Sequence, residues 1–96
     1  MTIGVIATLT VLEGKNADFE EIFTRLAAQV NASEAGCTFY QLHKSREDLQ
    51  VYKVLEQYTD QAALETHGKT DYFRAAGKEL AGCMAAAPEL EFVDGV

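Results

Sequence analysis

The sequence contains few basic residues, a single proline and no tryptophan. Its 8 lysines and arginines stand against 15 aspartates and glutamates, which gives a net charge of −7, and they form no cluster. Proteins that bind a phosphate backbone, or lie on a membrane through a basic helix, usually carry such a cluster. We therefore expect no nucleic-acid partner and no membrane partner. The low proline content and the 48% share of hydrophobic residues argue against a disordered chain.

Long hydrophobic runs are also absent. No apolar run approaches the roughly 18 residues of a membrane-spanning helix. Residues 1–14 begin apolar, but they lack the basic start and the small-residue cleavage site of a signal peptide. The sequence therefore predicts a cytoplasmic protein whose first segment is a strand.

The chain has no motif for a bound nucleotide, a metal or a disulfide framework. Neither GxGxxG nor a P-loop occurs, and the two histidines, His43 and His67, belong to different predicted elements. Cys37 and Cys83 are far apart and have no CxxC or metal-ligand spacing. An unpaired cysteine commonly packs as a small apolar residue. We expect two reduced, buried thiols and no metal site.

A regular hydrophobic pattern predicts one domain over residues 1–96. Residues 2–11 are rich in β-branched residues and are apolar on both alternations, as in a strand covered on both faces. From residue 19 to residue 30, apolar residues recur every three or four positions, which predicts an amphipathic helix. Gly36, in the turn that follows, can adopt a positive φ. Further strands are predicted at 37–45, 51–59 and 90–96. Between the last two strands we expect a short helix that Asp60 caps and Gly68 ends, and a second helical piece between Thr70 and Pro88.

This order, βαββαβ, is that of the split βαβ or ferredoxin-like α+β fold. We expect a four-stranded antiparallel sheet with two helices on one face. Because the strands are apolar on both alternations, the other face needs a cover. A homodimer that packs sheet against sheet would supply it.

Several residues in order carry a resemblance to a known family. They are Gly36-Cys37, Tyr40, the pair Glu56 and Tyr58 separated by one residue, His67 and Phe73. With this pattern the chain resembles the antibiotic biosynthesis monooxygenase superfamily, in its quinol-monooxygenase-like branch, over nearly its whole length. Members often carry tryptophan where Tyr58 stands, so stacking of a substrate on an indole is not expected.

The resemblance implies a cofactor-independent monooxygenase that oxidises a quinol or polyphenolic small molecule with O₂. Such chemistry needs a group that accepts a proton near neutral pH and a dry apolar pocket. We expect His67 to take the proton and Glu56 to orient the imidazole. Rings suit a small aromatic substrate by stacking, and phenol groups can bond its oxygens. The expected substrate-binding residues are Tyr40, Tyr58, Tyr72 and Phe73.

Other interpretations remain open at this point. His67 lies near a predicted helix C-terminus and can act there as a cap, and Glu56 can be a salt-bridge partner in a dimer interface. The rings can be core residues. A His/Glu pair would also serve an isomerase of a small phosphorylated signalling metabolite. The sequence shows no obvious phosphate clamp for it, although Lys53, Lys69 and Arg74 could contribute. The third alternative is a non-catalytic dimeric ligand-binding module, because this scaffold hosts many functions.

Overall fold

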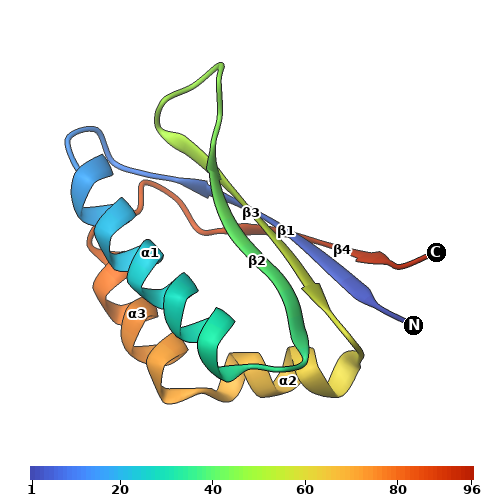
Figure 1. Cartoon of the computed structure of the whole chain (residues 1–96). Helices are drawn as coiled ribbons and strands as arrows, with labels where there is room; N and C mark the ends of the chain where they lie inside the picture. The colour runs from blue at the N-terminus through green and yellow to red at the C-terminus, as the bar shows by residue number, and fades with distance from the viewer.

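A computed structural model describes residues 1–96, and in it four antiparallel strands form one sheet with three helices packed beside it (Figure 1). The predicted ferredoxin-like α+β fold is confirmed. The strand order across the sheet is β2-β3-β1-β4, so β2 and β4 are the edges. The elements are β1 (Ile3–Thr10), α1 (Asn16–Ser33), β2 (Cys37–Lys44), β3 (Val51–Tyr58), α2 (Gln61–Lys69), α3 (Asp71–Ala81) and β4 (Glu89–Asp94).

Helices α1 and α3 lie side by side over one face of the sheet, and α2 runs across its end (Figure 1). The apolar positions of α1 are spaced to face the sheet together, and Phe19, Phe23, Leu26 and Val30 are all buried. Full burial of each such side chain contributes about 1.5–3 kcal/mol. None of the three helices has the length and apolar content needed to cross a membrane.

The second helical region is two helices joined at Thr70. The backbone of Thr70 is extended, its hydroxyl donates to the His67 carbonyl at 2.9 Å, and the same oxygen accepts from Phe73 N at 3.3 Å. One side chain therefore ends α2 and begins α3. Gly68 was expected to end the short helix, but α2 continues to Lys69. The predicted cap at Asp60 is confirmed, since its carboxylate accepts from Ala63 N at 2.9 Å.

Gly36 has a different role from the one predicted. Gly14 is the residue with a positive φ, at 86°, whereas Gly36 does not have one. A Cβ on Gly36 would lie 2.6 Å from the Cβ of Ala63 in α2. Glycine is needed there because the turn before β2 and the helix α2 approach closely.

The two faces of the sheet differ in how they are covered. Every residue of β4 is exposed, so the helices protect the sheet only as far as β1. On the face away from the helices, Phe39, Leu55 and Val93 are 45%, 37% and 40% exposed. The same face carries the exposed hydrogen bond between Lys53 Nζ and Thr8 at 2.9 Å. The far face is therefore apolar over one half and polar over the other, rather than apolar throughout.

Candidate functional site

A cavity of about 440 Å³ lies between the sheet and α3. Its walls are mostly apolar, and Glu56 is the ionisable carboxylate among them. Leu90 and Pro88, both exposed, belong to the wall, so the cavity reaches the surface beside β4. The other wall residues include Leu9, Phe23, Leu26, Tyr40, Val54, Phe73, Leu80 and Met84. A concave, mostly apolar space with a few polar groups is the usual form of a small-molecule site.

Glu56 is placed on this wall by the alternation of β3. Tyr52, Val54 and Tyr58 share its side of the strand and are buried beneath the helices. The Tyr58 hydroxyl donates to Glu56 Oε1 at 2.6 Å, and the other carboxylate oxygen accepts no hydrogen bond from the chain. Burial raises the pKa of Glu56 to about 7, against the lowering effect of the Tyr58 hydrogen bond. Glu56 can therefore exchange a proton at neutral pH.

Tyr40 stands opposite Glu56 as its direct cross-strand partner on β2. Its ring is 3% exposed and stacks on Phe23, with 5.8 Å between ring centroids. The Tyr40 hydroxyl makes no hydrogen bond within the chain. Every side-chain nitrogen or oxygen that is shut off from solvent has a hydrogen-bond partner, so this hydroxyl is not shut off and opens to the cavity. Burial, followed by the nearby Glu56 charge, raises the pKa of Tyr40 far above its usual range. Tyr40 therefore offers a neutral O–H donor.

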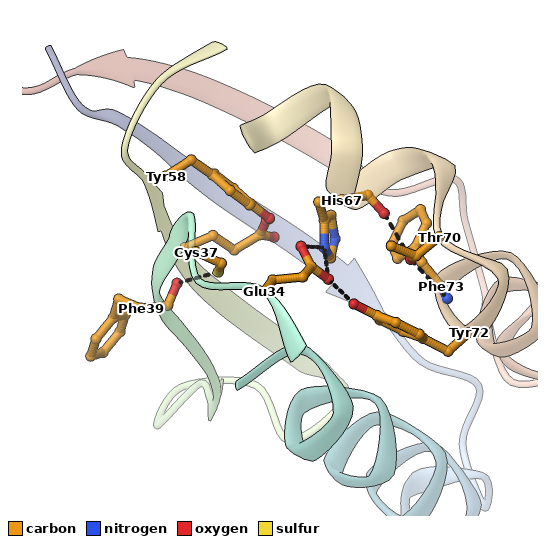
Figure 2. Close-up of polar contacts among 9 residues, drawn as sticks. Glu34, Cys37, Phe39, Tyr58, His67, Thr70, Tyr72 and Phe73 are labelled. Carbon is orange, nitrogen blue, oxygen red and sulfur yellow. Dashed lines mark hydrogen bonds and ion pairs between the residues drawn. The ribbon is translucent and has the colours of Figure 1, made fainter. Parts of the chain in front are cut away.

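His67 is held by a carboxylate that was not predicted. Its Nδ1 lies 3.1 and 3.2 Å from the two carboxylate oxygens of Glu34, the residue that follows α1, and both side chains are more than 90% buried (Figure 2). The Tyr72 hydroxyl also donates to Glu34 Oε2. Burial and this hydrogen bond raise the pKa of Tyr72 to about 12. Because the imidazole binds Glu34 rather than helix carbonyls, His67 is not the helix cap of the alternative interpretation.

The six predicted site residues thus divide into two layers. Tyr40, Glu56 and Phe73 line the cavity, whereas His67, Tyr58 and Tyr72 do not. The His67 ring packs on the rings of the first layer, 5.2 Å from Tyr40 and 4.6 Å from Phe73 by their centroids. The expected contact between Glu56 and His67 is replaced by two separate pairs, Glu56 with Tyr58 and Glu34 with His67.

Sequence reasoning missed Glu34 because nothing local marks it. It is one of 15 acidic residues and is separated from His67 by 33 positions. Only the packing of the α1 end against α2 and α3 brings the three side chains together. A buried carboxylate is costly unless it is paired, which explains why Glu34 takes both donors.

The other candidate sites give weaker support for a functional role. A second hollow of about 450 Å³ lies between α1 and β2, but its polar groups Glu20, Lys44 and Tyr52 bond to one another. No group of three or more His, Cys, Asp or Glu side chains is arranged to hold a metal ion. Cys37 and Cys83 are free and buried as predicted, and burial raises the pKa of Cys37 to about 11.

The chain has recognisable relatives among known proteins. The model of the antibiotic biosynthesis monooxygenase family matches residues 2–79. The chain belongs to this family. Membership supports a monooxygenase-like role on a small molecule, as the sequence predicted. A comparison with curated protein sequences found no match.

Solved structures agree with the family. A crystal structure from Caulobacter crescentus, provisionally named an antibiotic biosynthesis monooxygenase, is 52% identical, with a TM-score of 0.97 over 99% of this chain and 90% of that chain. A protein from Pseudomonas aeruginosa is 28% identical, with a TM-score of 0.89 over 99% of this chain and 94% of that chain. A family protein from Nitrosomonas europaea, 20% identical with a TM-score of 0.91 over 99% and 90% of the two chains, supports the fold alone.

Proposed function

We propose that the protein is a cofactor-independent monooxygenase that oxidises a quinol or polyphenolic small molecule with O₂. The observation that carries the proposal is the pair of polar groups in the apolar cavity. Glu56, with a pKa raised to about 7, and the unpaired Tyr40 hydroxyl both line it. A phenolic hydroxyl can accept from Tyr40 and donate to Glu56 at the same time.

The electron balance of the reaction requires no external reductant. A quinol and O₂ give a hydroxyquinone and water, so one oxygen atom enters the ring and the other leaves as water. The ring supplies four electrons, two on going from quinol to quinone and two on forming the new C–O bond. What the protein must do is remove a proton from the substrate, hold the anion and exclude water.

Two groups are proposed for the proton step. Glu56 is favoured as the acceptor because it lines the cavity and titrates near neutral pH. His67 stays a predicted catalytic residue, and it lies behind Tyr40 and Phe73. Tyr40 and Phe73 are the proposed substrate contacts in the wall, and Tyr58 and Tyr72 would support them from behind.

The cavity favours this proposal over the isomerase of a phosphorylated metabolite. Lysine and arginine are the usual side-chain donors to a phosphate group, and none lines the cavity. The three candidate cations, Lys53, Lys69 and Arg74, are also absent from the wall, and Lys53 is bonded to Thr8 on the other face of the sheet.

A homodimer and a cytoplasmic location complete the proposal. The apolar half of the far face, with Phe39, Leu55 and Val93 exposed, supports a second copy packed sheet against sheet. The two free thiols suit a reducing compartment.

Oxygen consumption by the purified, metal-free protein against a panel of hydroquinones tests the function. We expect consumption with at least one quinol and one hydroxylated product per O₂. Activity that appears only after a metal or a flavin is added would rule out a cofactor-independent reaction. Binding without turnover would favour the non-catalytic module, and turnover of a phosphorylated metabolite would favour the isomerase.

A further inference from the structure

We infer that Glu34 is a positioning residue of this site, whose carboxylate keeps a proton on His67 Nδ1 and so leaves Nε2 as a proton acceptor. The inference rests on the proposed function for its catalytic meaning. Its structural content, the state of the His67 ring, stands independently and is tested separately.

The contact geometry is the basis for assigning the proton to one ring nitrogen. Both oxygens of Glu34 lie within 3.2 Å of Nδ1. Glu34 Oε2 also accepts from the Tyr72 hydroxyl. A carboxylate in its ionised form only accepts hydrogen bonds, and in that form Nδ1 is the donor. When the neutral ring holds its proton on Nδ1, its lone pair lies on Nε2.

The other ring nitrogen is available. His67 Nε2 makes no hydrogen bond within the chain. Side-chain nitrogens and oxygens that are fully shut off from solvent all have hydrogen-bond partners, so Nε2 is not one of them. Nε2 is therefore open to a water molecule or a ligand, although the side chain as a whole is only 6% exposed. A histidine with one nitrogen bound to a carboxylate and the other free has the arrangement of a general base.

The surroundings leave Glu34 as the charged partner of the ring. The imidazole packs against the rings of Tyr40, Tyr58 and Phe73. Figure 2 shows it with Tyr58 on one side and Phe73 on the other. The titratable groups in contact with the ring are Tyr40 from β2, Tyr58 from β3 and Glu34 itself. One hydrogen bond further away are Tyr72, which is bonded to Glu34, and Glu56, which is bonded to Tyr58. Burial raises the pKa values of Tyr40 and Tyr58, so these phenols remain neutral near pH 7.

Glu34 also fixes where the ring stands. It follows α1, whereas His67 is near the end of α2 and Tyr72 is in the first turn of α3. One carboxylate thus joins both sides of the α2–α3 junction. Phe73, the next residue after Tyr72, reaches the cavity wall from this junction. Without Glu34, neither the tautomer nor the position of the His67 ring would be fixed.

The test measures the His67 tautomer by nitrogen-15 NMR at about pH 9, above the usual titration range of histidine. We expect the proton on Nδ1 in the unmodified protein. Since the free side chain favours a proton on Nε2, Glu34→Met, which is unbranched and apolar, should move the proton to Nε2. The matched control, Tyr72→Phe, removes the other hydrogen bond of Glu34 and should keep the Nδ1 proton.

The rate provides the second arm of the test. Glu34→Met should lower kcat by roughly 10-fold or more with a smaller change in KM, because Glu34 does not line the cavity. Glu79→Gln, which breaks only the exposed Arg25–Glu79 pair, should leave kcat unchanged. A kcat of folded Glu34→Met equal to that of the unmodified protein would overturn the positioning role.

The two arms separate the inference from the proposed function. A proton on Nε2 in the unmodified protein, or no change of tautomer in Glu34→Met, would overturn the inference whatever the activity. If Glu34→Met does not fold, the His67 tautomer measured in the unmodified protein still tests the inference. The expected tautomers without any oxygen consumption would instead support the ring geometry and reject the monooxygenase.

Discussion

Tyr40 and Glu56 face each other across β2 and β3, and both line the same cavity. Direct partners on neighbouring antiparallel strands have Cβ atoms about 4.5–5.5 Å apart. A neutral donor and a carboxylate that titrates near neutral pH are therefore held on one rigid surface. Sites built on strands keep such geometry better than sites on loops.

Glu56→Gln is expected to lower kcat/KM by roughly 10² or more, because an amide cannot accept the substrate proton. In the unmodified protein, kcat/KM should rise with pH through about 7 as Glu56 loses its proton, and the variant should lose this dependence. Oxygen consumption measured across pH 5–9 checks both points. Glu21→Gln is the matched control, because Glu21 is exposed and does not line the cavity. A variant that keeps full activity would remove Glu56 from the mechanism.

Stability should fall as pH rises through the titration of Glu56. Its pKa is raised from an ordinary value near 4.5 to about 7, so the folded state binds more protons than the unfolded state between these values. The stabilisation is full below pH 4.5 and is lost by about pH 7, a loss of about 3 kcal/mol. Denaturant unfolding of Glu56→Gln and the unmodified protein at pH 5 and pH 8 isolates this effect. A stability difference between the two proteins that does not change with pH would contradict it.

Tyr40→Phe should weaken quinol binding by roughly 10-fold, the value of about one hydrogen bond. Folding stability should hardly change, because the Tyr40 hydroxyl has no partner in the chain. Tyr52→Phe is the matched control, since its hydroxyl donates to Glu20 and accepts from Asn16 outside the cavity. Tyr52→Phe should be less stable than the unmodified protein and should bind quinol with unchanged affinity. Calorimetric titration and thermal unfolding separate the two variants, and equal affinities for quinol in all three proteins would refute the assigned contact.

The proposed dimer should depend on Leu55. Leu55→Glu places a charge in the apolar half of the far face, where Ile6 is its cross-strand neighbour. We expect light scattering at micromolar concentration to give a dimer mass for the unmodified protein. The variant should be a monomer or unfold, because an obligate dimer loses its stability with its interface. Leu49→Glu, in the exposed β2–β3 loop, should remain a dimer. A monomeric unmodified protein would end the proposal.

The sequence by itself determined the elements of the fold and their order. The spacing of Phe19, Phe23 and Leu26 and the alternation in β3 are local patterns, and each sets which side chains face the core. The alternation also placed Glu56 beside Tyr58 on one face, and the structure has both there. The cap at Asp60 was equally local, because it depends on residues three positions apart.

Tertiary structure decided the partners of the ionisable groups. Glu34 meets His67 only after α1 and α2 pack at the same end of the sheet, and no pattern within one element marks that contact. Phe73 contacts His67 on one side and lines the cavity on the other. Burial of Glu56 in the folded chain raises the pKa of its carboxyl. The role of Gly36 was settled in the same way, by the approach of Ala63 from another element. Periodicity depends on residues that are neighbours in the sequence. The desolvation and the partners of an ionisable group depend on the distant residues that folding brings next to that group.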